Sequence, residues 1–129
     1  MPPPRDMQVT EQRTVDLLTH IMTDDYSRRI LLSAVAEPKT VEELSKENDI
    51  PLSTCYRRVH EMLEGGALIV ERIVVTRVGK KYELYRSAFR GLNITLDGRI
   101  ITMEATINES ISDRLHSTWT AMKWNKPGA

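Results

Sequence analysis

The stretch from Ser53 to Glu64 carries side chains that suit binding to a nucleic acid. At 100° per residue its apolar residues share one arc of a helix and are expected to face the core; they are Leu52, Cys55, Val59, Met62 and Leu63. Outside that arc lie hydroxyl, aromatic, imidazole and guanidinium side chains, at Ser53, Thr54, Tyr56, Arg57, Arg58 and His60. Arginine bonds guanine through two parallel hydrogen bonds, and hydroxyls suit phosphates or base edges. The pattern predicts a helix that enters the major groove of duplex DNA; the alternative is a basic surface helix without a ligand.

A basic turn follows this helix in the sequence. Arg77, Lys80 and Lys81 surround Gly79, between two strands predicted at 67–77 and 81–89. A basic hairpin tip can lie along the phosphate backbone or enter the minor groove, so we expect these three residues to bind DNA. The strand residues Arg72 and Arg86 are weaker candidates. The alternative is an edge hairpin whose lysines discourage aggregation.

The charge distribution agrees with a basic surface in the middle of the chain. The 129 residues hold 18 basic and 18 acidic side chains, so the net charge is zero. Residues 1–50 hold 6 basic and 10 acidic side chains, a net of −4, whereas residues 51–90 hold 8 and 4, a net of +4. A localised anion-binding surface explains this gradient, and so does a solvated face crossed by salt bridges.

Three earlier helices are predicted to position this segment. A stripe of Val15, Leu18 and Met22 indicates a helix from Thr10 onward. Asp24 or Asp25 can cap a second helix, which is expected to end near Glu37 because the following proline disfavours helix. Thr40 and Glu43 form a capping box for a short helix through about Glu47. Ser53 is expected to cap the DNA-binding helix, and Gly65-Gly66 to end it near Glu64.

A second hairpin and a last helix are predicted after residue 91. Leu92, Ile94 and Leu96 alternate before the turn signal Asp97-Gly98. We expect Ile94 to face Ile101, and Leu92 to face Met103. Residues 106–109 read as a second capping box. A helical stripe follows at Ile107, Ile111, Leu115, Trp119 and Met122.

This element order predicts an α+β winged helix-turn-helix with an added β-hairpin and with N- and C-terminal dimerisation helices. Residues 1–9, with three consecutive prolines, are expected to be a disordered tail. Residues 10–90 would form the winged helix-turn-helix DNA-binding domain with its N-terminal helix. Residues 91–125 would form the β-hairpin and the C-terminal dimerisation helix.

The segment from Asp25 to Arg86 resembles the archaeal ArsR-like winged helix-turn-helix transcription regulators. The resemblance rests on the stretches YSRRIL at 26–31, IPLSTCYRRV at 50–59, ERIVVT at 71–76 and GKK at 79–81, and it covers roughly half of the chain. It implies a dimeric, sequence-specific DNA-binding regulator without implying a target. Metal-sensing members of the wider group carry paired cysteines on a helix of the helix-turn-helix, and this sequence has the single Cys55.

The ends of the chain are predicted to form a homodimer interface. The stripe that ends in Trp119 and Met122 is longer than a small winged domain needs for its own core. Two terminal helices that pack across a two-fold axis would set two DNA-binding helices about one DNA turn apart. The predicted interface residues are Leu18, Met22, Ile111, Leu115, Trp119 and Met122. The alternative is that both helices fold back onto their own subunit.

Other classes of function find little support in the sequence. HEMLE at 60–64 lacks the second histidine of a zinc protease motif, and there is no glycine-rich phosphate loop. We therefore expect neither an enzyme nor a metal or other cofactor. The sequence has no run of 18 apolar residues that could span a membrane. The lone cysteine favours a reducing, cytoplasmic setting.

Three functions remain open at this stage. The leading hypothesis is a homodimeric regulator of transcription that reads double-stranded DNA. The second is a winged-helix module for protein–protein interaction within a transcription assembly. The third is a sensor whose small-molecule effector binds between the 92–105 hairpin and the terminal helix.

Overall fold

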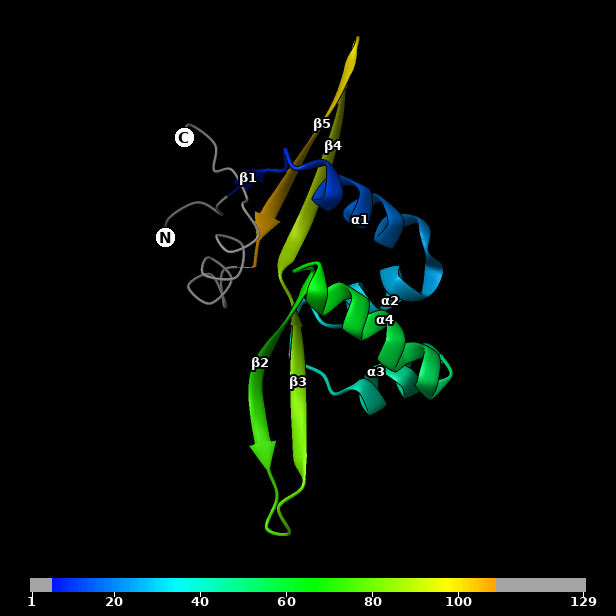
Figure 1. The fold of residues 1–129 in the computed structure, drawn as a ribbon, viewed down its shortest axis with the longest axis vertical. Helices are drawn as coiled ribbons and strands as arrows, with labels where there is room; N and C mark the ends of the chain where they lie inside the picture. The colour runs from blue at the N-terminus through cyan, green and yellow to red at the C-terminus, as the bar shows by residue number, and fades with distance from the viewer. Residues whose placement is uncertain (1–5, 109–129) are drawn as a thin grey trace.

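The computed structural model describes residues 6–108. The helices in this range are α1 (Gln12–Thr23), α2 (Asp25–Ser33), α3 (Val41–Asn48) and α4 (Leu52–Glu64). The strands are β1 (Asp6–Gln8), β2 (Leu68–Val75), β3 (Lys81–Ser87), β4 (Phe89–Asp97) and β5 (Ile100–Ile107). The hairpins β2–β3 and β4–β5 extend from the helices in opposite directions (Figure 1). The described residues thus form the predicted α+β winged helix-turn-helix with an added β-hairpin.

The helices begin largely as their sequences predict. Asp24 caps α2 by accepting a hydrogen bond from the backbone N–H of Ser27 at 2.9 Å. Thr40 and Glu43 form the expected capping box of α3. The prediction that Ser53 caps α4 is wrong, because this helix already begins at Leu52, with Pro51 in the N-cap position and no side-chain cap. The Pro51 carbonyl accepts from the Cys55 N–H at 2.9 Å and closes the first turn.

Helix α2 ends at Ser33, several residues before the predicted Glu37. The chain leaves the helix because its next residues pair with β3 instead. Lys39 and Tyr85 exchange both backbone hydrogen bonds, at 2.9 and 2.7 Å. The Arg86 guanidinium also donates to the carbonyl oxygens of Val35 and Ala36, both at 2.9 Å. The α2–α3 connection therefore runs along the base of the β2–β3 hairpin.

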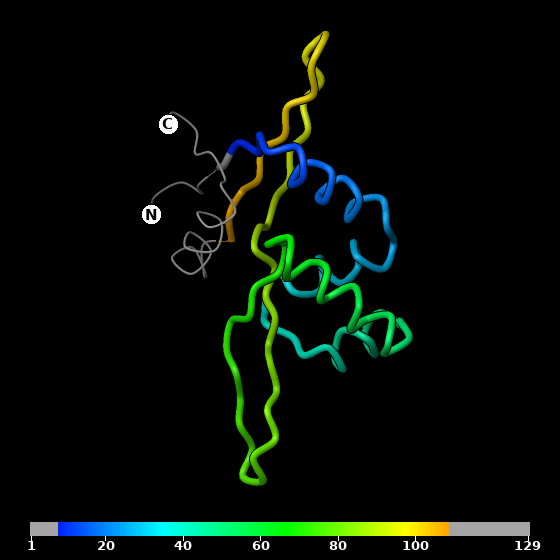
Figure 2. Tube along the Cα trace, in the orientation of Figure 1, coloured from blue at the N-terminus to red at the C-terminus, as the bar shows by residue number. Residues whose placement is uncertain are grey.

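The β2–β3 hairpin is the wing of the fold. Its strands pair from Leu68 opposite Ser87 to Val75 opposite Lys81, with a register shift around Glu71. At the tip, Gly79 has a φ of 81°, a conformation that glycine adopts without strain. The wing extends well beyond the helices, and Figure 2 shows the same path along the backbone.

The second sheet has the order β1-β5-β4. The prediction of a disordered tail through residue 9 is wrong from Asp6 onward, because β1 pairs with β5. Val9 is buried, and its N–H donates to the carbonyl oxygen of Met103 at 2.9 Å. The second capping box is also wrong, because β5 continues to Ile107.

The register of β4 with β5 differs from the prediction by two residues. Ile94 faces Met103 rather than Ile101, and Leu92 faces Ala105 rather than Met103. The two-residue loop is Gly98-Arg99, because Asp97 pairs with Ile100. Gly98, with a φ of 63°, takes the first loop position, where a primed hairpin turn requires positive φ. A shift of two residues preserves the faces of the strands, so one face remains apolar.

The core lies where the helices meet the roots of both hairpins. Cys55, Val59 and Met62 face it from α4 as predicted, whereas Leu52 is 46% exposed because it lies at the very start of the helix. Gly66, with a φ of 79°, ends α4 in the left-handed conformation. Gly65 packs against Leu17 of α1, whose Cδ2 would have to move aside for a Cβ at this position.

Candidate nucleic-acid interface

Helices α3 and α4 form a helix-turn-helix that presents one face of α4. The turn is made by Asp49, in the left-handed conformation at a φ of 53°, and by the buried Ile50. Opposite the buried residues of α4, the side chains of Ser53, Tyr56, Arg57 and His60 are exposed, and Thr54 is half-buried. Five of the six residues predicted to bind DNA on this helix therefore have access to solvent.

Arg58 is the exception among them. Its side chain is 20% exposed, and its Nε lies 3.1 Å from Oδ2 of Asp24, the N-cap of α2. Nη2 donates to Oδ1 of the same carboxylate at 3.2 Å. The expectation that Arg58 binds DNA stays a prediction, and such a contact would require the guanidinium to leave Asp24. Periodicity places Arg58 on the flank of the helix but gives no sign that Asp24 lies beside it.

Two further residues of the α4 face have carboxylate partners. The Tyr56 hydroxyl donates to Oε1 of Glu42 at 2.9 Å, and this bond raises the pKa of Tyr56. Nε2 of His60 lies 3.0 Å from Oε1 of Glu64, one helical turn away. Arg57, next to Tyr56, is exposed and has no ion pair with any described residue. Arg57 is therefore the described cation of α4 that remains available to an anion.

The wing tip carries the other exposed cations predicted to bind DNA. Arg77, Lys80 and Lys81 are all exposed, and none has an ion pair within residues 6–108. The Lys80 ammonium lies 5.2 Å from the centroid of the Tyr82 ring, a cation–π geometry. The tip is held by the Thr76 N–H, which donates to the Lys80 carbonyl oxygen at 2.8 Å. The sequence prediction therefore identified a group of cations that the structure holds together at one tip.

The weaker candidates on the wing strands separate into two kinds. Arg72 is exposed on β2. Arg86 has a structural role instead, because its guanidinium binds two carbonyl oxygens and Nη1 lies 2.8 Å from Oε1 of Glu71. Its side chain is 12% exposed. Arg86 is therefore a weaker candidate for a DNA contact than Arg72.

Lys46 is a cation near α4 that sequence reasoning missed. It lies on α3, is exposed, and has no ion pair among the described residues. Its only signal in the sequence is its place on the polar face of a helix-turn-helix element. Arg13 and Arg99 are also exposed without an ion pair in this part of the chain, but they lie on α1 and at the tip of the β4–β5 hairpin.

The predicted interface residues have different environments. Leu18 is 1% exposed within its own chain, so the expectation that it contacts a partner is wrong. Met22 is 37% exposed. The other predicted interface residues, Ile111, Leu115, Trp119 and Met122, lie outside the described residues, as does the predicted C-terminal helix.

Within residues 6–108, no group of three histidine, cysteine or acidic side chains could hold a metal ion. Cys55 is fully buried, and burial raises the pKa of its thiol to about 11. None of the described helices combines the length and apolar character needed to cross a bilayer.

One of the comparisons with known proteins agrees with the motif. Residues 22–71 match a family model described as a helix-turn-helix domain. No curated protein matches the chain. Among solved structures, it is similar to a homodimeric winged helix-turn-helix DNA-binding domain from Mycobacterium bovis, a possible ArsR-family transcriptional regulator. The identity is 14% and the TM-score 0.48, over 86% of this chain and 80% of that chain.

Two further solved structures are similar at lower TM-scores. One is the crystal structure of an ArsR family transcriptional regulator, with 16% identity and a TM-score of 0.42 over 89% of this chain and 91% of that chain. The other is reduced HlyU from Vibrio cholerae, with 10% identity and a TM-score of 0.40 over 81% and 83%. The matched residues 22–71 contain α3 and α4, so the family model and the structure place the helix-turn-helix in the same part of the chain.

Proposed function

We propose that this protein is a transcription regulator that binds double-stranded DNA in a sequence-specific manner. The observation that carries the proposal is that some of the described cations are paired within the protein and others are exposed. Arg58 and Arg86 are paired within the described residues, whereas Arg57 on α4 and the three cations at the wing tip are exposed without an ion pair to any described residue. Exposed cations on a helix-turn-helix and on its wing suit the phosphate backbone of a duplex.

The recognition helix in this proposal is α4. Its N-terminal residues Ser53, Thr54 and Arg57 would meet base edges or phosphates in the major groove, because the first turns of a recognition helix lie closest to the bases. Tyr56 and His60 flank this face and would contact the backbone after exchanging their carboxylate partners. Arg77, Lys80 and Lys81 would lie along the backbone or in the minor groove.

The protein is proposed to act as a homodimer. Two recognition helices related by a two-fold axis read two half-sites and multiply the specificity of one. Met22 and the apolar residues Ile111, Leu115, Trp119 and Met122 are the proposed contributors to the partner contact.

The test is a selection of duplexes from a random pool, followed by fluorescence anisotropy in increasing salt. A selected site that binds at least 10³-fold tighter than its scrambled version is expected of a specific regulator. A salt slope that is steep for both duplexes, with equal affinities, would contradict sequence specificity while leaving DNA binding intact. Absence of binding at low salt would overturn the proposal.

A protein-interaction module is the second candidate, favoured by the apolar residues of the wing. Ile73 and Val75 share one face of β2 and are 53% and 59% exposed. DNA does not account for apolar groups along a strand, whereas a protein partner that adds its own apolar surface would. Replacing both residues with threonine distinguishes the two functions. Weakened DNA binding would show that this face of β2 contributes to the DNA contact and would support the regulator. Unchanged DNA binding would support a protein partner on this face.

A further inference from the structure

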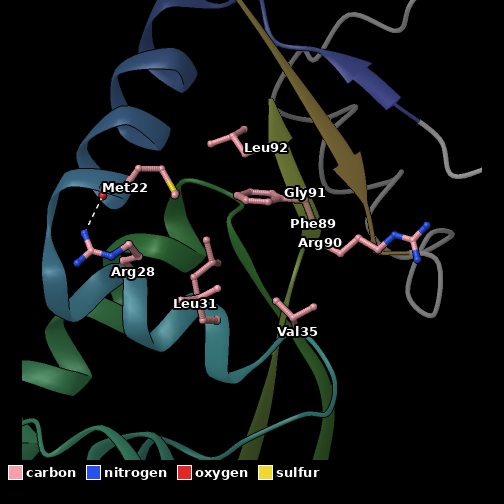
Figure 3. Close-up of a pocket in the computed structure, with 9 residues that line it drawn as sticks. Met22, Arg28, Leu31, Val35, Phe89, Arg90, Gly91 and Leu92 are labelled. Carbon is pink, nitrogen blue, oxygen red and sulfur yellow. Dashed lines mark hydrogen bonds between the residues drawn. The ribbon is translucent and has the colours of Figure 1, made fainter. Parts of the chain in front are cut away.

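An apolar groove lies between the end of α1, α2 and the start of β4. It has a volume of about 140 Å³. Its apolar lining comes from Met22, Leu31, Leu32, Val35, Phe89 and Leu92. Figure 3 shows the labelled members of this lining converging from Met22 at the end of α1, from α2 and from β4. Leu32 is 67% exposed, which is unusual for a leucine beside other apolar side chains.

The described chain leaves the fold beside this groove. Ile107, the last residue of β5, pairs with the groove residue Phe89. The N–H of Asn108 donates to the carbonyl oxygen of Ala88 at 3.1 Å, and its Nδ2 donates to that of Val35 at 3.0 Å. The last two described residues, Ile107 and Asn108, therefore lie next to the groove residues Phe89 and Val35.

The sequence that follows has apolar residues at helical spacing. Ile111 and Leu115 come three and seven residues after Asn108. In a helix, these positions lie about 5 and 10 Å along the axis, within reach of the groove. Trp119 and Met122 come later in the same stripe and extend past it.

We propose that the groove is the docking site for residues 109–118 of the same chain, with Ile111 and Leu115 seated in it. This anchors the C-terminal stretch beside Met22 at the end of α1, and it directs Trp119 and Met122 toward the second copy. The inference narrows the proposed dimer contact to Trp119 and Met122, because Ile111 and Leu115 would be covered within their own chain, and it does not depend on DNA binding.

A small-molecule effector is a less suitable occupant. The groove is smaller than the roughly 300–1,000 Å³ of common ligand pockets. The guanidinium of Arg28, at one end of the groove, is already bonded to Asp25 at 2.8 Å and to the Met22 carbonyl oxygen at 3.0 Å. Asp25 already neutralises the charge that would attract an anionic ligand. Apolar side chains from the protein's own chain need no such charge.

Chemical cross-linking of the full-length protein tests the docking directly. The double variant Leu32→Cys/Leu115→Cys is treated with a short bismaleimide at low protein concentration. Cys55 is fully buried, so it is expected to stay unreactive in the folded protein. A single linker that joins both cysteines within one chain supports the proposal. A covalent dimer would overturn it in favour of the partner's segment, and two separately capped thiols would overturn docking altogether.

A matched pair of variants provides a second measurement by hydrogen exchange. Leu32→Glu places a charge in the groove, and Val78→Glu places the same charge at the wing tip, where Val78 is 89% exposed. Leu32→Glu is expected to remove protection from amides in residues 109–118 while those of β2 and β3 keep theirs. Equal exchange of residues 109–118 in both variants and the wild type would contradict docking. Neither measurement involves DNA, so failure here is distinct from failure of the proposed function.

Discussion

The Arg58 guanidinium lies against the Asp24 carboxylate, with Nε 3.1 Å from Oδ2 and both side chains 20% exposed. The same carboxylate caps α2 through the N–H and the hydroxyl of Ser27, at 2.9 and 2.7 Å. Asp24 thus joins the middle of α4 to the beginning of α2. Since α2 packs in the core through Ile30 and Leu31, the pair orients α4 relative to the rest of the domain.

Alanine substitution of the adjacent arginines of α4 is expected to affect two different properties, DNA binding for Arg57 and stability for Arg58. Arg57→Ala should lower the slope of log K against log salt by about one, because one phosphate contact is lost, while the melting temperature stays constant. Arg58→Ala should lower the free energy of unfolding by about 1–3 kcal/mol, because Asp24 loses its partner. Anisotropy and thermal melting on both variants check this. If Arg58→Ala lowered the salt slope and Arg57→Ala lowered the free energy of unfolding, Arg58 would be the DNA contact and Arg57 the structural residue.

The wing cations are expected to contribute affinity without selectivity. Lys80→Ala/Lys81→Ala should weaken binding to every duplex by a similar factor and lower the salt slope by about two. Arg99→Ala is the control, since Arg99 is an exposed cation at the tip of the opposite hairpin. Arg99→Ala removes one charge and the double variant removes two, so a decrease in salt slope half as large in the control would show that binding responds only to total charge.

Asp24 is expected to make stability depend on pH in the acid range. The backbone hydrogen bond from Ser27 is the main cause that lowers the pKa of Asp24 below its ordinary value of 3.8. A lowered pKa stabilises the fold above the unfolded-state pKa, and this contribution is lost as the pH falls through the folded-state value. In urea unfolding, the stability difference between wild type and Asp24→Asn should be constant from pH 7 to 5 and shrink below about pH 4. A constant difference down to pH 2.5 would contradict this role of the ionised carboxylate.

Cys55 is expected to report on global unfolding. Burial raises the pKa of its thiol to about 11, so little thiolate forms at pH 8. Iodoacetamide should leave the native protein unmodified for hours and should label it at once in denaturant. Rapid labelling under native conditions would mean that α4 opens locally, since Cys55 faces the core from this helix.

Arg86 is expected to stabilise the wing base through its shape as well as its charge. Arg86→Lys keeps the charge, but a single ammonium does not replace a fork that binds Glu71, Val35 and Ala36. The free energy of unfolding should fall by about 1–3 kcal/mol in urea titrations, with the DNA affinity of the folded protein unchanged. A loss of DNA affinity at constant stability would return Arg86 to the interface.

The sequence by itself determined the helix-turn-helix, the wing and the exposed cations at its tip. These features depend on local rules: apolar spacing on α4, the capping box of Thr40 and Glu43, and glycine at Gly66 and Gly79, where φ is positive. Local rules act within a few residues, so one sequence is enough to read them.

Only the tertiary structure decided which polar residues remain available. Arg57 and Arg58 are neighbours with the same chemistry, but Arg58 pairs with Asp24, which lies 34 residues away in the sequence. Leu18 and Met22 share one predicted stripe, yet only Met22 reaches the surface. The pairing of β1 with β5 joins residues about a hundred positions apart. Such contacts depend on which distant segments meet in the fold, and periodicity along the chain carries no information about these partners.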